Sequence, residues 1–190
     1  PPNAHWPSAY NSLPPGPSTA AAKAAAAGEK ALTMEGLDGG TKLQLLATIP
    51  ALYNKAGQND KAEAAAHKLI DYGKGQSDAK LSSQLQAGGY VMIGQFAEKA
   101  GNVGKAAENY IKAYALFKGP SISKTLNGLA SSLYKSGKFA EAEQVFRQFY
   151  ASDQGPESAA LLGQTLYKQN KTDEALAIFR EGYAKKKTAS

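Results

Sequence analysis

The sequence predicts an all-α fold, an α-solenoid of about four helix–turn–helix repeats. The first observation is a segment, found four times, in which one helix-like stretch ends and another begins. The spacings between the turn residues are 44, 36 and 33 positions, and these residues are Gly57, Gly101, Gly137 and Asn170. The second observation is that no alternating polar and apolar run predicts a strand. A repeat of this length is typical of solenoids, which present a surface rather than a reaction centre.

Composition narrows the class of protein. Hydrophobic residues make up 43% of the chain and charged residues 20%, which argues against global disorder. The net charge of +6, from 22 Lys and Arg against 16 Asp and Glu, gives a modest preference for acidic partners. No apolar run approaches the ~20 residues that cross a bilayer, so no membrane insertion is expected. The absence of cysteine excludes disulfides and thiolate sites, and it favours a bacterial periplasmic or otherwise exported protein over a cytoplasmic one.

Residues 1–17 are predicted to form a Pro-rich extended arm. Six prolines in this segment prevent a helix and favour extended backbone. Trp6, Tyr10 and Leu13 lie between the prolines. Two interpretations stay open: a linker, or an arm that docks its aromatic side chains on the solenoid or on a second copy, which would give a homo-oligomer.

Residues 18–40 are predicted to form an Ala-rich capping helix and a turn. Ser18 or Thr19 is the expected N-cap and Gly36 the expected stop. The apolar stripe of this helix is thin, but its alanines allow close packing on a neighbour. We therefore expect it to cover one end of the repeat array.

Residues 41–187 are predicted to hold the four helix pairs, in repeats near 43–76, 77–118, 121–152 and 156–187. The expected helices cover residues 41–56 and 59–72, 77–100 and 103–118, 121–136 and 139–151, and 156–169 and 172–187. Pro50 is expected to kink the first of them, and Gly88 with Gly89 is a candidate break in the third. Pro120 and Pro156, each after a glycine, open the last two repeats.

The repeats carry the same residue types at fixed positions. The second helix of each has a small residue where the two helices should cross, here numbered position 20: Ala62, Ala106, Ala142 and Ala175. Position 24 is expected to fill the space between adjacent pairs, with Ala66, Tyr110, Phe146 and Phe179. Positions 7 and 8 are large then small: Ile49-Pro50, Ile93-Gly94, Leu129-Ala130 and Leu162-Gly163.

These columns resemble the tetratricopeptide repeat family over roughly residues 43–187. The second and fourth repeats match best, while the first departs most because Pro50 and Ala66 replace a small and an aromatic residue. The resemblance implies a non-catalytic protein–protein interaction scaffold. Its concave groove would bind a peptide, a helix or a partner subunit.

The resemblance also implies which residues contact the partner, because helix A of this family lines the groove with positions 2, 5, 9, 12 and 13. The partner-binding residues implied in this way are Lys55, Gln95, Lys99, Asn127, Tyr134, Lys135, Gln164, Tyr167 and Lys168. Position 13 is lysine in all four repeats. This column is either a ladder of ammonium groups for an acidic peptide or a set of cations that complement the helix dipoles. The tyrosines at position 12 are either flat anchors for a ligand or half-buried packing residues.

The carboxylate clamp of chaperone-binding members is not found, since it needs Lys and Asn at positions 5 and 9. No catalytic, metal-binding or cofactor-binding residue is predicted: His5 and His67 lack ligand spacing, and there is no serine elbow or phosphate loop. The alternative function is binding of nucleic acid or another anionic polymer through the lysine column. Against it, Arg147 and Arg180 are the only arginines, and acidic residues occur in every repeat.

Overall fold

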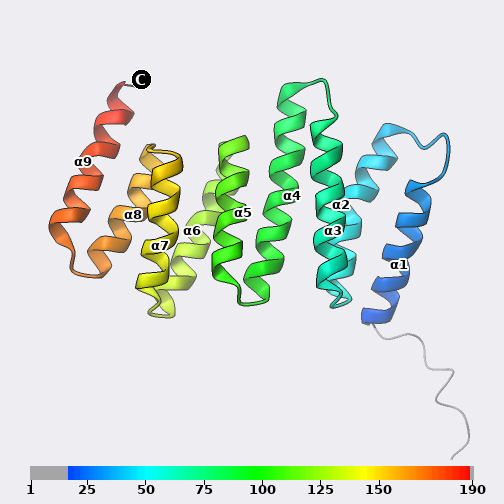
Figure 1. The fold of residues 1–190 in the computed structure, drawn as a ribbon, viewed down its shortest axis with the longest axis horizontal. Helices are drawn as coiled ribbons and strands as arrows, with labels where there is room; N and C mark the ends of the chain where they lie inside the picture. Colours follow the sequence, from blue (N-terminus) through cyan, green and yellow to red (C-terminus); the bar gives the residue numbers. More distant parts are fainter. Residues whose placement is uncertain (1–16, 189–190) are drawn as a thin grey trace, which may run out of the picture. The chain divides into compact units, whose positions relative to one another are not determined.

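The structure is a computed structural model that describes residues 17–188, with side chains for residues 18–185. This range holds nine α-helices and no strand, in agreement with the predicted all-α class (Figure 1). The helices are α1 Pro17–Leu32, α2 Gly39–Lys55, α3 Asn59–Lys74, α4 Ala79–Lys99, α5 Val103–Leu116, α6 Pro120–Lys135, α7 Phe139–Ser152, α8 Pro156–Lys168 and α9 Thr172–Thr188. The chain divides into two compact units, Pro1–Ala65 and Ala66–Ser190, and each is described by itself.

The start of α1 differs from the prediction. The helix begins at Pro17, so Ser18 and Thr19 lie inside it and neither is its N-cap. Proline suits the first turn of a helix because its missing N–H has no partner there in any case. The rest of the predicted arm, residues 1–16 with Trp6 and Tyr10, lies outside the described residues.

The predicted break at Gly88 and Gly89 was wrong, because α4 runs through both residues without interruption. A Cβ atom on Gly89 would lie 2.5 Å from Ile70 Cγ1 of α3 and 3.0 Å from the carbonyl oxygen of Ala66. This glycine therefore permits close packing of two helices rather than a turn.

The four predicted turns share one geometry. Gly57, Gly101 and Gly137 have φ angles of 76°, 77° and 68°, and Asn170 has 60°. In the turn at Gly137, the Gly137 N–H donates to the Tyr134 carbonyl at 3.1 Å and the Lys138 N–H to the Leu133 carbonyl at 2.9 Å. This pair of bonds is the Schellman motif, which satisfies the last carbonyls of the helix. Equivalent bonds close all four turns, so the repeated sequence segment specifies a repeated hairpin.

The first unit contains α1, α2 and the start of α3. Ala21, Ala25 and Gly28 are buried, and a Cβ on Gly28 would lie 3.0 Å from Ile49 Cγ1 of α2. The Tyr53 hydroxyl donates to the Glu29 carboxylate at 2.7 Å, which joins the same two helices. The small side chains of α1 thus allow the close packing expected for this segment.

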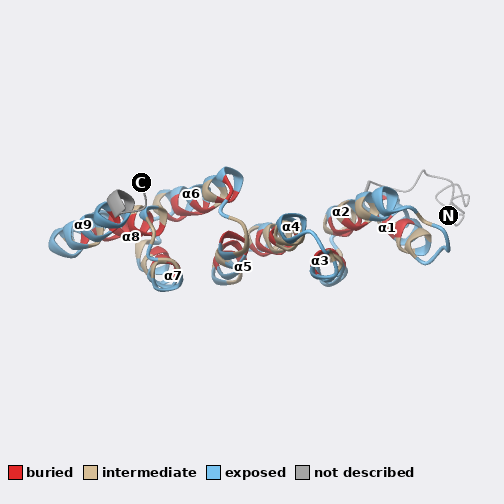
Figure 2. Cartoon of the chain, turned by 90° about the horizontal axis from the view of Figure 1, so that it is seen from above, coloured by how far each residue is buried: buried red, intermediate tan, exposed pale blue. Residues whose placement is uncertain are grey.

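The second unit stacks its helices in two layers. Figure 2 shows α5 and α7 on one side and α6 and α8 on the other, with the buried surfaces between them. Position 20 is buried as predicted, with Ala106 and Ala142 fully shielded and Ala175 1% exposed. The core around these residues includes Tyr110, Phe146, Phe149, Leu126, Leu129, Leu162 and Leu166.

Within the described residues, no helix combines the length and the apolar character needed to cross a membrane.

Candidate functional site

The lysine column lies where the sequence predicted, in the last turn of the first helix of each pair. Lys55 ends α2 in the first unit, while Lys99, Lys135 and Lys168 end α4, α6 and α8 in the second. All four side chains are exposed. This position fits both interpretations, since a cation at a helix C-terminus also complements the dipole by roughly 0.3–1 kcal/mol.

The three predicted amide side chains have different surroundings. Gln95 and Gln164 are exposed on α4 and α8. The Asn127 amide nitrogen on α6 donates to the Ser123 carbonyl at 2.9 Å and to the Glu157 carboxylate at 2.7 Å. The donors of Asn127 are thus engaged within the fold, which leaves its side-chain oxygen for a partner.

The two predicted tyrosines are not equivalent, although both occupy position 12. The Tyr134 hydroxyl lies 2.7 Å from Thr165 Oγ1 and 3.4 Å from the Leu161 carbonyl oxygen, both on α8. Burial raises the pKa of this half-buried phenol, and the hydrogen bond with Thr165 opposes the rise. Tyr167, by contrast, is 62% exposed. Tyr134 is therefore a packing residue with one accessible face, and Tyr167 is free to contact a partner.

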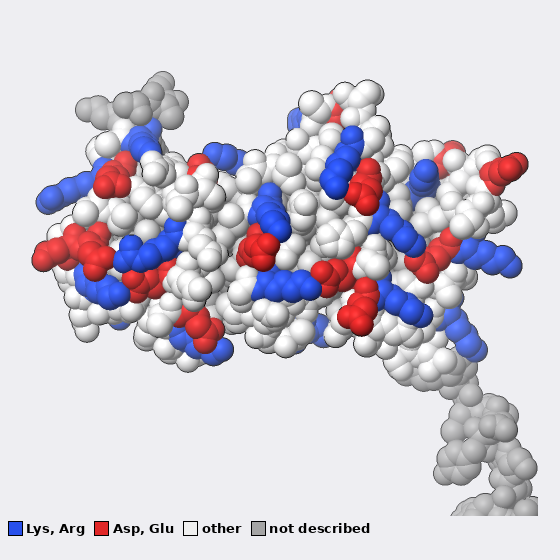
Figure 3. Space-filling model, viewed as in Figure 1, with Lys and Arg blue, Asp and Glu red and all other residues white. Residues whose placement is uncertain are grey.

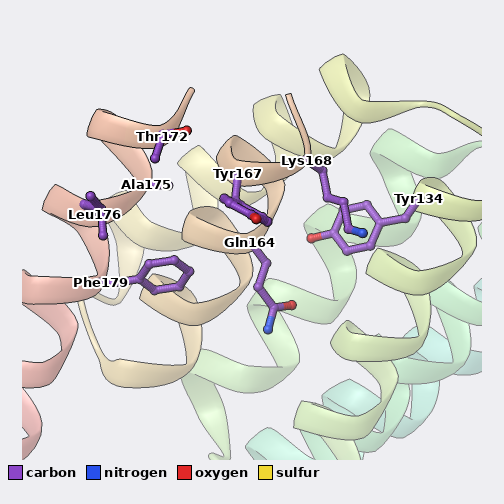
Figure 4. Close-up of a pocket in the computed structure, with 8 residues that line it drawn as sticks. All are labelled: Tyr134, Gln164, Tyr167, Lys168, Thr172, Ala175, Leu176 and Phe179. Carbon is purple, nitrogen blue, oxygen red and sulfur yellow. The ribbon is translucent and has the colours of Figure 1, made fainter. Parts of the chain in front are cut away.

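Four of the predicted residues meet at one apolar hollow between α8 and α9, called here the α8–α9 hollow (Figure 4). Its volume is about 420 Å³. The first helices of the last two pairs supply Tyr134, Gln164, Tyr167 and Lys168, and α9 supplies Thr172, Ala175, Leu176 and Phe179. The lining is mostly hydrocarbon and aromatic, and its polar groups are the Gln164 amide, the Lys168 ammonium and the hydroxyls of Tyr134, Tyr167 and Thr172. Such a surface can bind an apolar side chain and hold one polar or acidic group beside it.

The α9 half of the hollow was missed by the sequence reasoning. Phe179 was predicted to fill the space between adjacent pairs, but it is 37% exposed, and Leu176 is 46% exposed. One signal was available. Position 21, where Leu176 lies, holds Glu63, Ala107 and Glu143 in the other repeats, so a large apolar residue is new at this place.

Ion pairs and hydrogen bonds join the third and fourth repeats. Glu143 of α7 accepts hydrogen bonds from Lys171 and Gln169 at 2.7 Å and 2.8 Å, and it pairs with Arg147 at 2.8 Å. The hydrogen bond from Lys171, then those from Arg147 and Gln169, lower the pKa of this carboxyl to about 2. Arg147 also pairs with Glu174 of α9 at 2.7 Å. These contacts fix the position of α8 and α9 against α7.

Charges of both signs are mixed on the face seen in Figure 3. Several lysines pair with carboxylates there or nearby, among them Lys74 with Asp71, Lys112 with Glu108, and Lys118 with Asp153. No continuous basic surface stands out in this view. The predicted binding of an anionic polymer thus stays a prediction without a structural observation in its favour.

The part of the chain that the structure describes contains no cluster of three or more His, Asp or Glu side chains placed to hold a metal ion. Another hollow in the second unit has a volume of about 310 Å³. It is lined by Gln84, Ala87, Gly88, Val91, Phe117, Ser121 and Ile122. It lies between α4 and α6 and includes none of the predicted partner-binding residues.

Helix hairpins closed by turns of one geometry, with an apolar hollow on the surface of the second unit, define a helical-repeat protein, a class that presents binding surfaces. The family model for the tetratricopeptide repeat matches residues 91–159 and 127–190, which together are more than half of the chain. The chain belongs to the tetratricopeptide repeat family. Repeats of this family generally mediate protein–protein interaction. A search among curated proteins finds no match.

Proposed function

We propose that this protein is a non-catalytic scaffold that binds a segment of another protein on the helix-A face of its second unit, centred on the α8–α9 hollow. One observation carries the proposal: Tyr134, Gln164, Tyr167 and Lys168, all implied as partner-binding residues, line the same apolar hollow. The partner is a peptide, a helix or a subunit of an assembly.

The chemistry of the hollow supports this function. Tyr167 and Leu176 are 62% and 46% exposed and offer large apolar surfaces. Covering these surfaces with a partner would stabilise the complex. Tyrosine is among the residues most often found to dominate the energy of protein interfaces. The Tyr134 ring is held by its hydrogen bond with Thr165, so little conformational entropy is lost from this side chain when a partner binds.

The lysine column extends the proposal along the second unit. Lys135 and Lys168 are exposed at equivalent positions of neighbouring repeats, and Lys99 occupies the same position one repeat earlier. An acidic segment laid along this face would meet one ammonium group per repeat. If the lysines serve only the helix dipoles, their removal will change stability and leave binding unchanged.

Display of a random peptide library tests the proposal directly. Peptides selected on the wild-type chain are measured against a variant with Tyr167→Ala and Lys168→Gln. The matched control is Lys112→Gln with Gln148→Ala, which changes two exposed residues on α5 and α7. We expect the hollow variant to lose at least tenfold in affinity and the control to stay within twofold of wild type. Equal affinity for all three proteins would place the site elsewhere, and a library that yields no binder would contradict the scaffold function.

The lysine column is tested with the same selected peptides. A variant with Lys99, Lys135 and Lys168 changed to Gln is expected to bind acidic peptides more weakly and with a flatter dependence on salt. An unchanged affinity and salt dependence would leave these lysines as helix-end charges.

A further inference from the structure

We propose that the α8–α9 hollow is the seat of an amphipathic α-helix of a partner protein, docked on the fourth repeat in the register in which α8 docks on the third. The inference rests on the proposed function and specifies the conformation and chemistry of the bound segment.

The packing of α8 on the third repeat supplies the template. At position 12, Tyr134 bonds with Thr165 and Leu161 of α8. At position 17, the Phe139 carbonyl accepts from Gln169 at 3.3 Å, just after the end of α8. At position 24, Phe146 is 0% exposed and belongs to the core that contains Leu161, Leu162 and Leu166 of α8. One helix therefore covers positions 12 to 24 of the third repeat.

The same positions of the fourth repeat line the hollow. Positions 12, 17 and 24 are Tyr167, Thr172 and Phe179, and positions 20 and 21 between them are Ala175 and Leu176. Ala175 is only 1% exposed and belongs to the core that contains Leu162 and Leu166 of α8, whereas Phe179 is 37% exposed. The hollow is thus the surface that corresponds to the seat of α8, one repeat further along the chain.

The spacing on α9 indicates a helix as the ligand. Thr172, Ala175, Leu176 and Phe179 follow the pattern i, i+3, i+4 and i+7, which forms one stripe along two turns. In Figure 4 these residues form one wall of the hollow, and Tyr167 and Gln164 of α8 form the other. A stripe beside a second helix makes a groove into which the ridge of a third helix packs. Recognition of an amphipathic helix in such a groove is an established binding mode.

The side chains of the hollow define the chemistry of the partner helix. In the third repeat, position 21 is Glu143. Its carboxylate accepts hydrogen bonds from Gln169 and from the cation Lys171, which lie between α8 and α9. In the fourth repeat this position is Leu176, so the partner needs an apolar residue there and no cation. Lys168 on the rim favours an acidic residue beside it. The fitting helix has a leucine-rich face, a hydroxyl or carbonyl acceptor for Tyr167, and an acidic flank.

The outer side of α1 does not fit this description, which argues against a second copy docking through its own first helix. Its exposed residues are small or charged and include Ala20, Lys23, Ala24 and Ala27. The methyl groups of the alanines are too short to fill a groove lined by Leu176 and Phe179. A partner helix with large side chains meets the requirement.

The experiment uses a probe with the sequence of α8, stapled across its solvent side to keep it helical and labelled for fluorescence anisotropy. In the acidic probe the residues that correspond to Gln164 and Lys168 are Glu, and in the basic probe both are Lys. A third probe has the residues that correspond to Leu161, Leu162 and Leu166 changed to Ala. All are titrated into the full chain. The protein variants are Leu176→Glu in the hollow and, as a matched control, Leu81→Glu on α4, where the leucine is 38% exposed.

We expect the acidic probe to bind at least tenfold more tightly than the Ala probe and more tightly than the basic probe, with the second difference shrinking at high salt. Leu176→Glu should weaken the acidic probe at least tenfold, and Leu81→Glu should not. Circular dichroism checks that both variants remain helical. Equal binding of the acidic and Ala probes, or no effect of Leu176→Glu, would overturn the proposal.

Two further outcomes separate this inference from the function on which it rests. If an unstapled, proline-containing acidic peptide competes as well as the helical probe, the ligand is extended. The proposal of a helical ligand is then wrong, and the proposed scaffold function is unaffected. If sedimentation shows a dimer that Leu176→Glu dissociates, a second copy occupies the hollow and the partner helix is wrong. Failure of the scaffold itself would appear as the absence of any binder in the library selection.

Discussion

The third and fourth repeats carry the same residues at several equivalent positions, but in different surroundings. Phe146 and Phe179 share position 24, yet they are 0% and 37% exposed. Tyr134 and Tyr167 share position 12, yet the first bonds with Thr165 of the next helix and the second is 62% exposed. The difference shows that a residue in a repeat array acquires its role from the neighbouring repeat as well as from its own sequence position. Side chains that are packed in an inner repeat are exposed where no neighbouring helix covers them.

The largest effect is expected from truncating the two phenylalanines. Phe146→Ala removes a fully buried ring and should lower the free energy of unfolding by about 3–5 kcal/mol. Phe179→Ala should cost about 1–2 kcal/mol, because part of the ring is already in water. Urea denaturation of both variants measures the difference. Equal losses would mean that the two positions are buried alike in solution, and the comparison would fail.

Two glycine substitutions probe how tightly the fourth repeat closes on itself. A Cβ on Gly163 would lie 2.5 Å from Phe179 Cε1, so Gly163→Ala should destabilise the protein by about 1–3 kcal/mol. Gly88 is the control, because a Cβ there would meet nothing within 4 Å. Gly88→Ala should stabilise α4 by roughly 0.5–1 kcal/mol, since alanine has the higher helix propensity. Thermal melting of both variants gives the two signs, and a neutral Gly163→Ala would show that Phe179 moves aside freely.

A small effect is expected at position 21, where the third repeat has Glu143 and the fourth has Leu176. The pKa of Glu143 is lowered to about 2 by Lys171, with Arg147 and Gln169 assisting, while an unfolded glutamate has a pKa of about 4.3. The ionised carboxylate therefore contributes stability above about pH 4.3, and this contribution is lost as the pH falls toward 2. Glu143→Gln should cost about 1 kcal/mol at pH 7, allowing for solvent screening, and much less near pH 2. Unfolding curves at several pH values test this, and a constant difference between the two proteins would rule out the ion pairs as its source.

The sequence predicted the hairpins well because their determinants are local. A left-handed residue five positions before a buried alanine specifies the turn and the helix crossing together, as at Gly137 and Ala142. The error at Gly89 has the opposite origin. Whether a glycine breaks a helix or lets another helix approach depends on what packs against it, here Ile70, and this is a tertiary contact.

The candidate site was predicted only by half for the same reason. Lys168, Gln164 and Tyr167 were predicted because they occupy the helix-A columns that the resemblance implies as groove-lining, and all three line the hollow. Leu176 and Phe179 occupy helix-B columns that are normally covered, and no pattern within the repeat tells whether a neighbour covers them. Asn127 shows the reverse case, because the carboxylate of Glu157, thirty residues later in the sequence, engages its donors.

The turn at Asn170 has a consequence for motion. Three of the four repeat turns use glycine in the left-handed region, and this one uses a residue with a Cβ, which occupies that region at a higher energy. The turn of the α8–α9 hairpin therefore carries a backbone cost that the glycine turns do not, and Asn170→Gly would remove it. A ligand that spans α8 and α9 would hold both helices of that hairpin and would therefore oppose its local opening. The protein would then register its partner as a slowing of hydrogen exchange at one end of the second unit.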